Sequence, residues 1–197
     1  GFGKTSSYHT GYDFDLHYFD IEAQTWGKVK ASNAPSKSSG HTAVMDAQQR
    51  MWIFGGFDFR LVLHDLHYFD IQAQTWQEVK ANSPPSKTAG HTAVMDAQQR
   101  MWVFGGSTRG NDHDLHYFDI QAKTWQQVNA SNPFAREDHA SVMDAQQRMW
   151  IFGGFDFRLV LHDLHYFDIQ AQTWQEVKAN SPPSKTAGHT AVMDAQQ

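Results

Sequence analysis

The chain of 197 residues contains no cysteine, which excludes disulfide bonds, thiolate nucleophiles and cysteine-ligated zinc. No stretch approaches eighteen consecutive apolar residues, so the sequence predicts no transmembrane helix and no membrane insertion. Positive charge is also scarce. The 16 Lys and Arg face 21 Asp and Glu, and the formal net charge of −5 argues against nucleic acid as a partner. Because Gly1 opens no recognisable signal peptide, an intracellular, cytoplasmic location is the default expectation.

Large apolar side chains are abundant instead. Hydrophobic residues make up 40% of the chain, and 14 Phe and 7 Trp are among them. This composition argues against disorder and predicts a core built from flat aromatic side chains.

An internal repeat runs through the chain. Trp26, Trp76, Trp125 and Trp174 follow one another at spacings of 50, 49 and 49 residues. Such periods are typical of proteins built from stacked structural units. We therefore expect a single domain over the whole of 1–197. Its expected units are 1–40, 41–90, 91–138 and 139–188, with 189–197 as a terminal strand of an incomplete or shared unit.

Two segments that lie two repeats apart are identical. Val44–Gln99 and Val142–Gln197 match at all 56 positions. Identity over such a length indicates nearly interchangeable modules, produced by recent duplication or by engineering.

Each unit contains four short runs rich in β-branched and aromatic residues, separated by Gly, Pro, Asn and Ser. In one unit the expected strands are His91–Met95, Met101–Phe104, Leu115–Ile120 and Thr124–Val128. The segment Ala43–Trp52 also has good helix propensity, which leaves a helix as an alternative to a hairpin. The repeat pattern favours the hairpin and an all-β fold.

The apolar runs are continuous rather than alternating, as in Met51–Phe54. Continuous runs are typical of strands that are buried on both faces. Small four-stranded sheets stacked face to face around an axis satisfy that requirement, and this arrangement is a β-propeller.

The repeat resembles the kelch family. Gly55-Gly56, then Phe69-Asp70, then Trp76 seven residues after Phe69 follow the family's pattern of a double glycine, an aromatic-Asp pair and a tryptophan. The first unit departs from it, because Phe2-Gly3-Lys4 replaces Phe-Gly-Gly. The WD40 pattern fits less well, since the chain contains no Trp-Asp dipeptide. The resemblance implies a kelch-type β-propeller of about four four-stranded blades.

Closure of the ring is an open question at this point. Rings of this family normally have more blades than this chain encodes. The chain opens at the end of a second strand and stops after a first strand, so a partial ring or a ring completed by another copy of the chain is expected. An open ring would expose apolar surface and favour self-association into a homo-oligomer.

Candidate chemistry is sparse. Gly1-Phe2-Gly3-Lys4-Thr5 resembles the end of a phosphate-binding loop but lacks its spacing and its preceding strand. His-Asp-Leu-His occurs at His64–His67 and in two later units, yet residues three apart in a strand point to opposite faces and do not chelate one ion. No arrangement typical of nucleophilic catalysis stands out. We therefore expect no catalytic residue, no metal site and no cofactor.

The resemblance places partner binding on the loops of one face, after the double glycine and before Gly-His. Aromatic residues beside arginines in these loops are typical of interaction hot spots, and arginine suits an acidic peptide. As alternatives, Phe57 and Phe155 seal blade edges and the arginines are solvated. The candidate partner-binding residues are Phe57, Arg60, Arg109, Arg136, Phe155 and Arg158.

The sequence thus predicts a non-enzymatic scaffold that binds a protein or peptide through these loops. A designed or self-assembling structural repeat protein is the first alternative, supported by the 56-residue identity. A metal-dependent enzyme on a kelch scaffold is a further alternative with less support.

Overall fold

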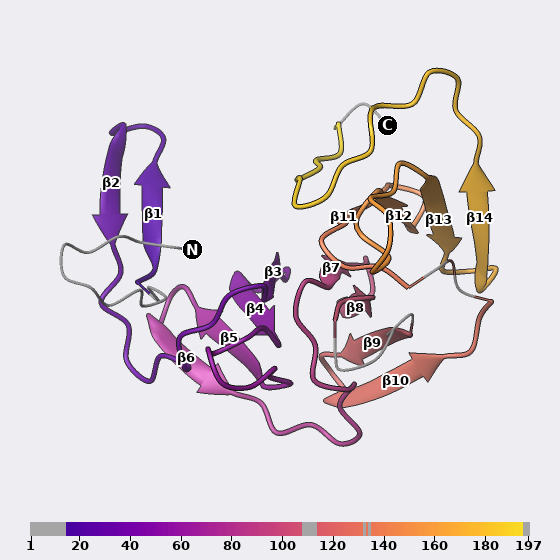
Figure 1. The fold of residues 1–197 in the computed structure, drawn as a ribbon. Helices are drawn as coiled ribbons and strands as arrows, with labels where there is room; N and C mark the ends of the chain where they lie inside the picture. The colour runs from indigo at the N-terminus through magenta and orange to yellow at the C-terminus, as the bar shows by residue number, and fades with distance from the viewer. Residues whose placement is uncertain (1–14, 108–113, 132, 134, 195–197) are drawn as a thin grey trace.

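The computed structural model of the protein describes residues 15–107, 114–131, 133 and 135–194. Within these residues the chain forms fourteen β-strands, and every pair of neighbouring strands is antiparallel. They form one two-stranded sheet and three four-stranded sheets (Figure 1).

In each sheet, strands that follow one another in sequence lie side by side. The two-stranded sheet consists of β1 (His17–Asp20) and β2 (Thr25–Lys28). The first four-stranded sheet consists of β3 (Thr42–Met45), β4 (Arg50–Phe54), β5 (Leu66–Asp70) and β6 (Thr75–Glu78). The second consists of β7 (Thr92–Met95), β8 (Arg100–Phe104), β9 (Leu115–Asp119) and β10 (Thr124–Val128). The third consists of β11 (Ala140–Met143), β12 (Arg148–Phe152), β13 (Leu164–Asp168) and β14 (Thr173–Val177).

The first strand of each four-stranded sheet lies innermost. β7 contacts both β3 and β11, and the sheets fan outward from these strands along an arc (Figure 1). Backbone hydrogen bonds join the segments that precede the inner strands. Gly90 N donates to Gly40 O at 2.9 Å, Asp138 N to Gly90 O at 2.8 Å, and Gly188 N to Asp138 O at 2.7 Å. Successive units are therefore linked near the middle of the arc by main-chain contacts.

The inner hairpin of each sheet turns around a buried aspartate. In the first complete sheet, Asp46 Oδ1 accepts hydrogen bonds from the backbone N–H groups of Gln48 and Arg50, both at 2.9 Å. Its Oδ2 accepts from Arg50 Nε and Trp52 Nε1, both at 2.7 Å. These four bonds hold the turn between β3 and β4, which pair as antiparallel strands. The hairpin prediction for Ala43–Trp52 is therefore confirmed, and the helix alternative is wrong.

Electrostatics at this aspartate follow from the same contacts. Burial raises the pKa of Asp46, but the hydrogen bonds from Trp52 and Arg50 outweigh burial, and the net pKa lies below its usual value. The Arg50 guanidinium lies 5.3 Å from the ring centroid of Trp52 and 5.2 Å from that of Tyr68. The aspartate thus stays charged, and the arginine that pairs with it also covers two aromatic rings.

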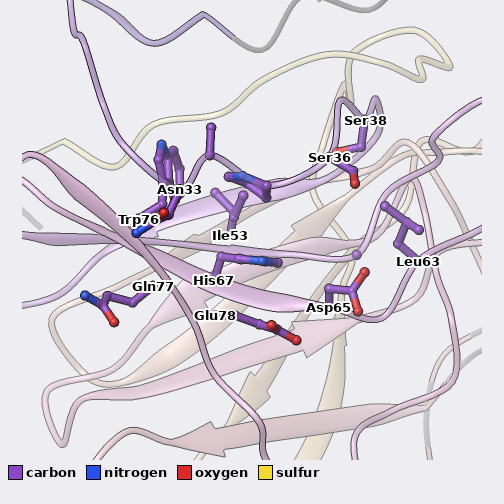
Figure 2. A pocket seen from close by; sticks show the side chains of 13 residues that line it. Asn33, Ser36, Ser38, Ile53, Leu63, Asp65, His67, Trp76, Gln77 and Glu78 are labelled. Atoms are coloured by element: carbon purple, nitrogen blue, oxygen red, sulfur yellow. The ribbon is translucent and has the colours of Figure 1, made fainter.

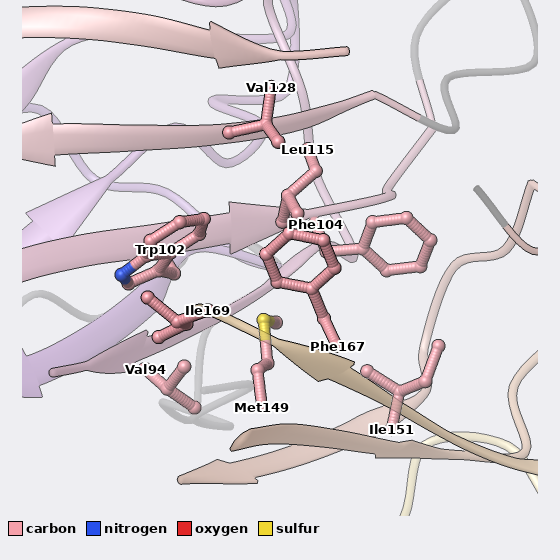
Figure 3. Close-up of a cluster of buried hydrophobic side chains, with 9 residues drawn as sticks. All are labelled: Val94, Trp102, Phe104, Leu115, Val128, Met149, Ile151, Phe167 and Ile169. Carbon is pink, nitrogen blue, oxygen red and sulfur yellow. The ribbon is translucent and has the colours of Figure 1, made fainter. Parts of the chain in front are cut away.

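Aromatic side chains fill the space between neighbouring sheets. Phe104 and Trp174 lie 4.9 Å apart between ring centroids, and Trp102 and Phe167 lie 5.6 Å apart. Trp102, Phe104 and Phe167 belong to the cluster of buried residues in Figure 3, which joins the second and third sheets, and Trp174 packs against this cluster. Each buried aromatic removes a large apolar area from water, so this contact accounts for much of the attraction between sheets. The predicted core of flat side chains is confirmed.

The double glycines allow neighbouring sheets to approach at the backbone. Gly105 has φ +69°, and a Cβ at this position would lie 2.5 Å from the carbonyl oxygen of Arg136 in the next linker. A Cβ added at Gly55 or Gly153 would likewise lie 2.5 or 2.7 Å from the carbonyl oxygen of Thr88 or Thr186, respectively. A side chain here would therefore push adjacent units apart.

We expect Gly105→Ala to lower the free energy of unfolding by about 2–5 kcal/mol, through left-handed strain and overlap with the next linker. Gly188→Ala is the matched control, because Gly188 has φ +68° and no atom within 4 Å of its added Cβ. Its loss should be about 1–2 kcal/mol. Urea unfolding of both variants measures the difference, and equal losses would contradict the close approach of the linker.

Candidate binding face

Two sets of loops meet on one face of the arc. The loop after the double glycine is paired with the segment before Gly-His, because Phe57 N donates to Ser39 O at 2.8 Å and Ser39 N donates to Phe57 O at 3.0 Å. Glu137 and Phe155 exchange the same pair of bonds, both at 2.9 Å. The structure therefore places the two predicted sets of loops together.

The loops of the first and third sheets each form a tight turn midway along the loop. Asp58 Oδ1 accepts hydrogen bonds from the backbone N–H of Arg60 at 2.9 Å and of Leu61 at 2.7 Å. These two bonds hold the pKa of the exposed Asp58 carboxyl below its usual value. Phe59 between them has φ +81°, a conformation that costs energy for a residue with a side chain. The segment 156–159 repeats this turn, with φ +71° at Phe157.

The predicted site residues occupy different environments. Arg60 and Arg158 are exposed at the two turns, whereas Phe57 and Phe155 are half-buried beneath them. Arg109 lies outside the described residues. The structure thus brings a phenylalanine and an arginine together in each of two loops.

Arg136 differs from the expectation of an exposed arginine. Its side chain is buried, and its Nη1 and Nη2 donate to Asp163 Oδ1 and Oδ2 at 2.8 and 2.7 Å. Nη1 also donates to the carbonyl oxygen of Gly153 at 3.0 Å. Burial raises the pKa of Asp163, but hydrogen bonds from His165 and Arg136 reverse this effect and hold it far below its usual value. Because these contacts bind the guanidinium to the third sheet and bury it, we omit Arg136 from the binding surface.

Exposed apolar residues flank the arginines and were not among the sequence candidates. The exposed fractions are 49% for Phe59, 56% for Leu61, 37% for Phe157 and 57% for Leu159. The sequence signal is the aspartate at the start of each turn, because an Asx turn projects the residues that follow it. We call the segments 58–61 and 156–159 the loop tips.

Two buried histidines, His91 and His139, come directly before the inner strands β7 and β11. His91 Nε2 lies 2.9 Å from Thr42 Oγ1, and His139 Nε2 lies 2.7 Å from Thr92 Oγ1. Burial lowers the pKa of both His91 and His139 to about 3, so both rings are neutral at pH 7. Among the described residues, no group of three or more His, Asp or Glu side chains is placed to hold a metal ion. The described residues also contain no helix with the length and hydropathy needed to span a membrane.

Four-stranded antiparallel sheets, repeated along an arc and packed through aromatic side chains, define the class of β-propeller repeat proteins. The family described as the KLHDC2/KLHL20/DRC7 Kelch-repeats domain matches residues 2–197. The chain therefore belongs to the kelch-repeat family, and the resemblance seen in its sequence is confirmed. Kelch domains commonly mediate protein binding and are typically non-catalytic. No individual curated protein matches the chain significantly.

Acidification should destabilise the fold through its buried histidines. An unfolded histidine binds a proton near pH 6.5, whereas folded His91 and His139 do so only near pH 3, so stability is lost as pH falls from about 6.5 towards 3. Each ring contributes up to about 1.4 kcal/mol per pH unit in this window. Urea unfolding at pH 7.5 and pH 5 measures the loss, and His139→Asn should have a shallower pH dependence. If the stability of His139→Asn fell with pH as steeply as that of the wild type, His139 would not be a source of the acid sensitivity.

Proposed function

We propose that this kelch domain binds a protein or peptide partner through its two loop tips and catalyses no reaction. The observation that carries this proposal is the repetition, at 58–61 and 156–159, of one turn that exposes an arginine between two apolar side chains. The alternatives of a purely structural repeat protein and a metal-dependent enzyme do not account for exposed Phe, Arg and Leu at both turns.

The chemistry of the tips supports an acidic partner with apolar side chains. An arginine binds a carboxylate through two parallel hydrogen bonds, and aromatic and arginine side chains dominate binding energies at protein interfaces. Phe59 and Leu61 flank Arg60 and offer apolar area beside its charge. Because hydrogen bonds to Asp58 fix the turn before a partner arrives, little conformational entropy is lost on binding.

Phe57 and Phe155 take a supporting part in this proposal. Each is half-buried, and Phe155 lies 6.2 Å from the ring of Phe157 in the exposed tip. Arg109, in the corresponding loop of the second sheet by sequence, stays a candidate contact.

The double variant Arg60→Ala, Arg158→Ala should bind selected peptides at least about tenfold more weakly, because each arginine forms charge-assisted hydrogen bonds. Peptides would be selected from a random display library on the wild-type domain and their affinities measured by fluorescence polarisation. We expect enrichment in Asp and Glu.

The matched control is Lys123→Gln. Lys123 lies in the β9–β10 turn, at the opposite end of the strands from the loop tips, and the other units have Gln at this position. Its peptide affinities should equal those of the wild type. Equal affinities in the double arginine variant would contradict the proposed surface.

A second proposal concerns self-association, and it rests on one exposed and one partly buried aromatic face. Phe19 and Trp26 in the two-stranded sheet are 45% and 74% exposed, whereas their counterparts Phe118 and Trp125 are 0% and 4% exposed. Those counterparts pack against Trp52 and Phe54 of the preceding sheet (ring centroids of Trp52–Phe118 5.6 Å, of Phe54–Trp125 4.8 Å).

The other half of this contact lies on the third sheet and is partly accessible. Trp150 and Phe152 of β12 correspond to Trp52 and Phe54, but they are only partly buried. We propose that Phe19 and Trp26 of one copy pack on Trp150 and Phe152 of a second copy, repeating the contact used between sheets.

Trp26→Glu should abolish such association, because a charge would be buried against aromatic rings. Native mass spectrometry at several concentrations should detect dimers of the wild type and monomers of the variant. Leu61→Glu is the control, since it changes another exposed apolar residue, at a loop tip, and should leave the dimer intact. A wild-type monomer at every concentration would overturn this second proposal.

A further inference from the structure

A cavity of about 550 Å³ lies between segment 33–38 and the first four-stranded sheet (Figure 2). Asp65, His67 and Glu78 lie along one side of it, and Ser38 and Gly55 also line it. His67 and Glu78 are paired across β5 and β6, so the sheet itself sets their positions. The side chains of Asp65 and Glu78 make this a negatively charged site.

The same place in the third sheet is filled by an arginine of the chain itself. Arg136 donates there to both carboxylate oxygens of Asp163 and to the carbonyl oxygen of Gly153, and none of its side chain is exposed. His165 Nε2 lies 2.8 Å from Asp163 Oδ2 and supports the carboxylate from the other side. This arrangement is a complete guanidinium site.

The residues that line the cavity on the side of the sheet are equivalent in sequence to those around Arg136, and equivalent residues of the first and third sheets are 98 positions apart. The residues 98 positions before Gly153, Asp163, His165 and Glu176 are Gly55, Asp65, His67 and Glu78. The identity of Val44–Gln99 with Val142–Gln197 covers all four of them.

The linker that faces these groups differs between the two places. At the position of Arg136 the first site has Ser38, whose Oγ lies 3.3 Å from His41 Nδ1. Within the described residues, the side chain of Asp65 accepts no hydrogen bond, whereas that of Asp163 accepts bonds from both ends of a guanidinium. On the side of the sheet, the cavity therefore has the groups of the Arg136 site without the arginine.

We propose that this cavity binds the arginine side chain of a peptide or protein partner. The guanidinium donates to both oxygens of Asp65 and to the carbonyl of Gly55, as Arg136 does in the third sheet. Glu78, which also lines the cavity, adds a second negative charge. A lysine fits less well, because its ammonium lacks the planar fork that matches a carboxylate.

The charge state of His67 favours this ligand. Burial lowers the pKa of His67, and the opposing effects of Asp65 and Glu78 do not reverse the shift. The imidazole is therefore neutral at pH 7 and does not repel a guanidinium.

The site is independent of the proposed function at the loop tips. None of residues 58–61 or 156–159 lines the cavity. A double Arg60→Ala, Arg158→Ala variant therefore keeps this site, and failure of one proposal leaves the other standing.

The test is an NMR titration of the whole domain with N-acetyl-arginine methylamide. The matched probes are the citrulline analogue, which has the same shape without charge, and the lysine analogue. We expect millimolar binding of the arginine probe and at least about tenfold weaker binding of the citrulline probe, since hydrogen bonds to charged groups are the stronger ones. Shifts should concentrate on amides near Asp65 and His67.

Two variants remove the site in different ways. Asp65→Asn removes the charge, and Ser38→Arg supplies the chain's own guanidinium, as the third sheet already does. Both should lose the arginine probe, while Lys123→Gln should bind it as the wild type does. Urea unfolding establishes that each variant is folded.

Three results would overturn the proposal. These are no binding of the arginine probe to the wild type, equal binding of the citrulline probe, and unchanged binding in folded Ser38→Arg or Asp65→Asn. Retained binding of the arginine probe in the double loop-tip variant, together with lost peptide binding, would support both proposals separately.

Discussion

The rest of the structure depends on a buried carboxylate at the turn of each inner hairpin. Asp46, Asp96 and Asp144 each hold the turn with one oxygen and the indole of the following tryptophan with the other. Because Trp52 and Trp102 pack against the next sheet, the aspartate of each of these two units fixes both the fold of the unit and the contact that joins it to its neighbour. A buried charge of this kind is tolerated only when it is fully hydrogen-bonded, as it is here by backbone, arginine and indole donors.

A scaffold repeated in this way leaves function to the positions where the units differ. The carbonyl, carboxylate and imidazole around Arg136 recur around Ser38, and the site is filled from within where the linker carries the arginine and open where it carries the serine. Ala140 offers a second example. In the first two sheets, Thr42 and Thr92 each form a hydrogen bond with the histidine of the next unit, His91 and His139. Ala140 occupies the equivalent position in the third sheet and has no hydroxyl, and neither ring nitrogen of His189 has a hydrogen-bond partner within the described residues.

The sequence predicted the features that depend on local pattern. The four strands of each of the three complete sheets and the aromatic core follow from residue types and spacing, and the structure confirms them. The burial of Arg136 was not predictable, because its partner Asp163 comes from the next unit and from a loop whose position is set by tertiary packing. The projection of Phe59 was missed because a positive φ at a bulky residue depends on the Asx turn before it. The divisions between repeat units near 1–40, 41–90, 91–138 and 139–188 stay predictions.

Arg60 at the loop tip is positively charged and Asp65 in the cavity is negatively charged, yet one loop supplies both residues. Residues 58–61 form the tip, while Gly55 and Asp65 at the two ends of the same loop line the cavity, and a hydrogen bond from Gly55 N to Asp65 O at 3.2 Å joins those ends. Because the ends are held together, the tip has a fixed relation to the cavity. A partner that placed a carboxylate on Arg60 could therefore place an arginine on Asp65 only if the two groups were correctly spaced. Such a pair of opposite charges would select partners by spacing as well as by sign, which a uniformly charged surface would not.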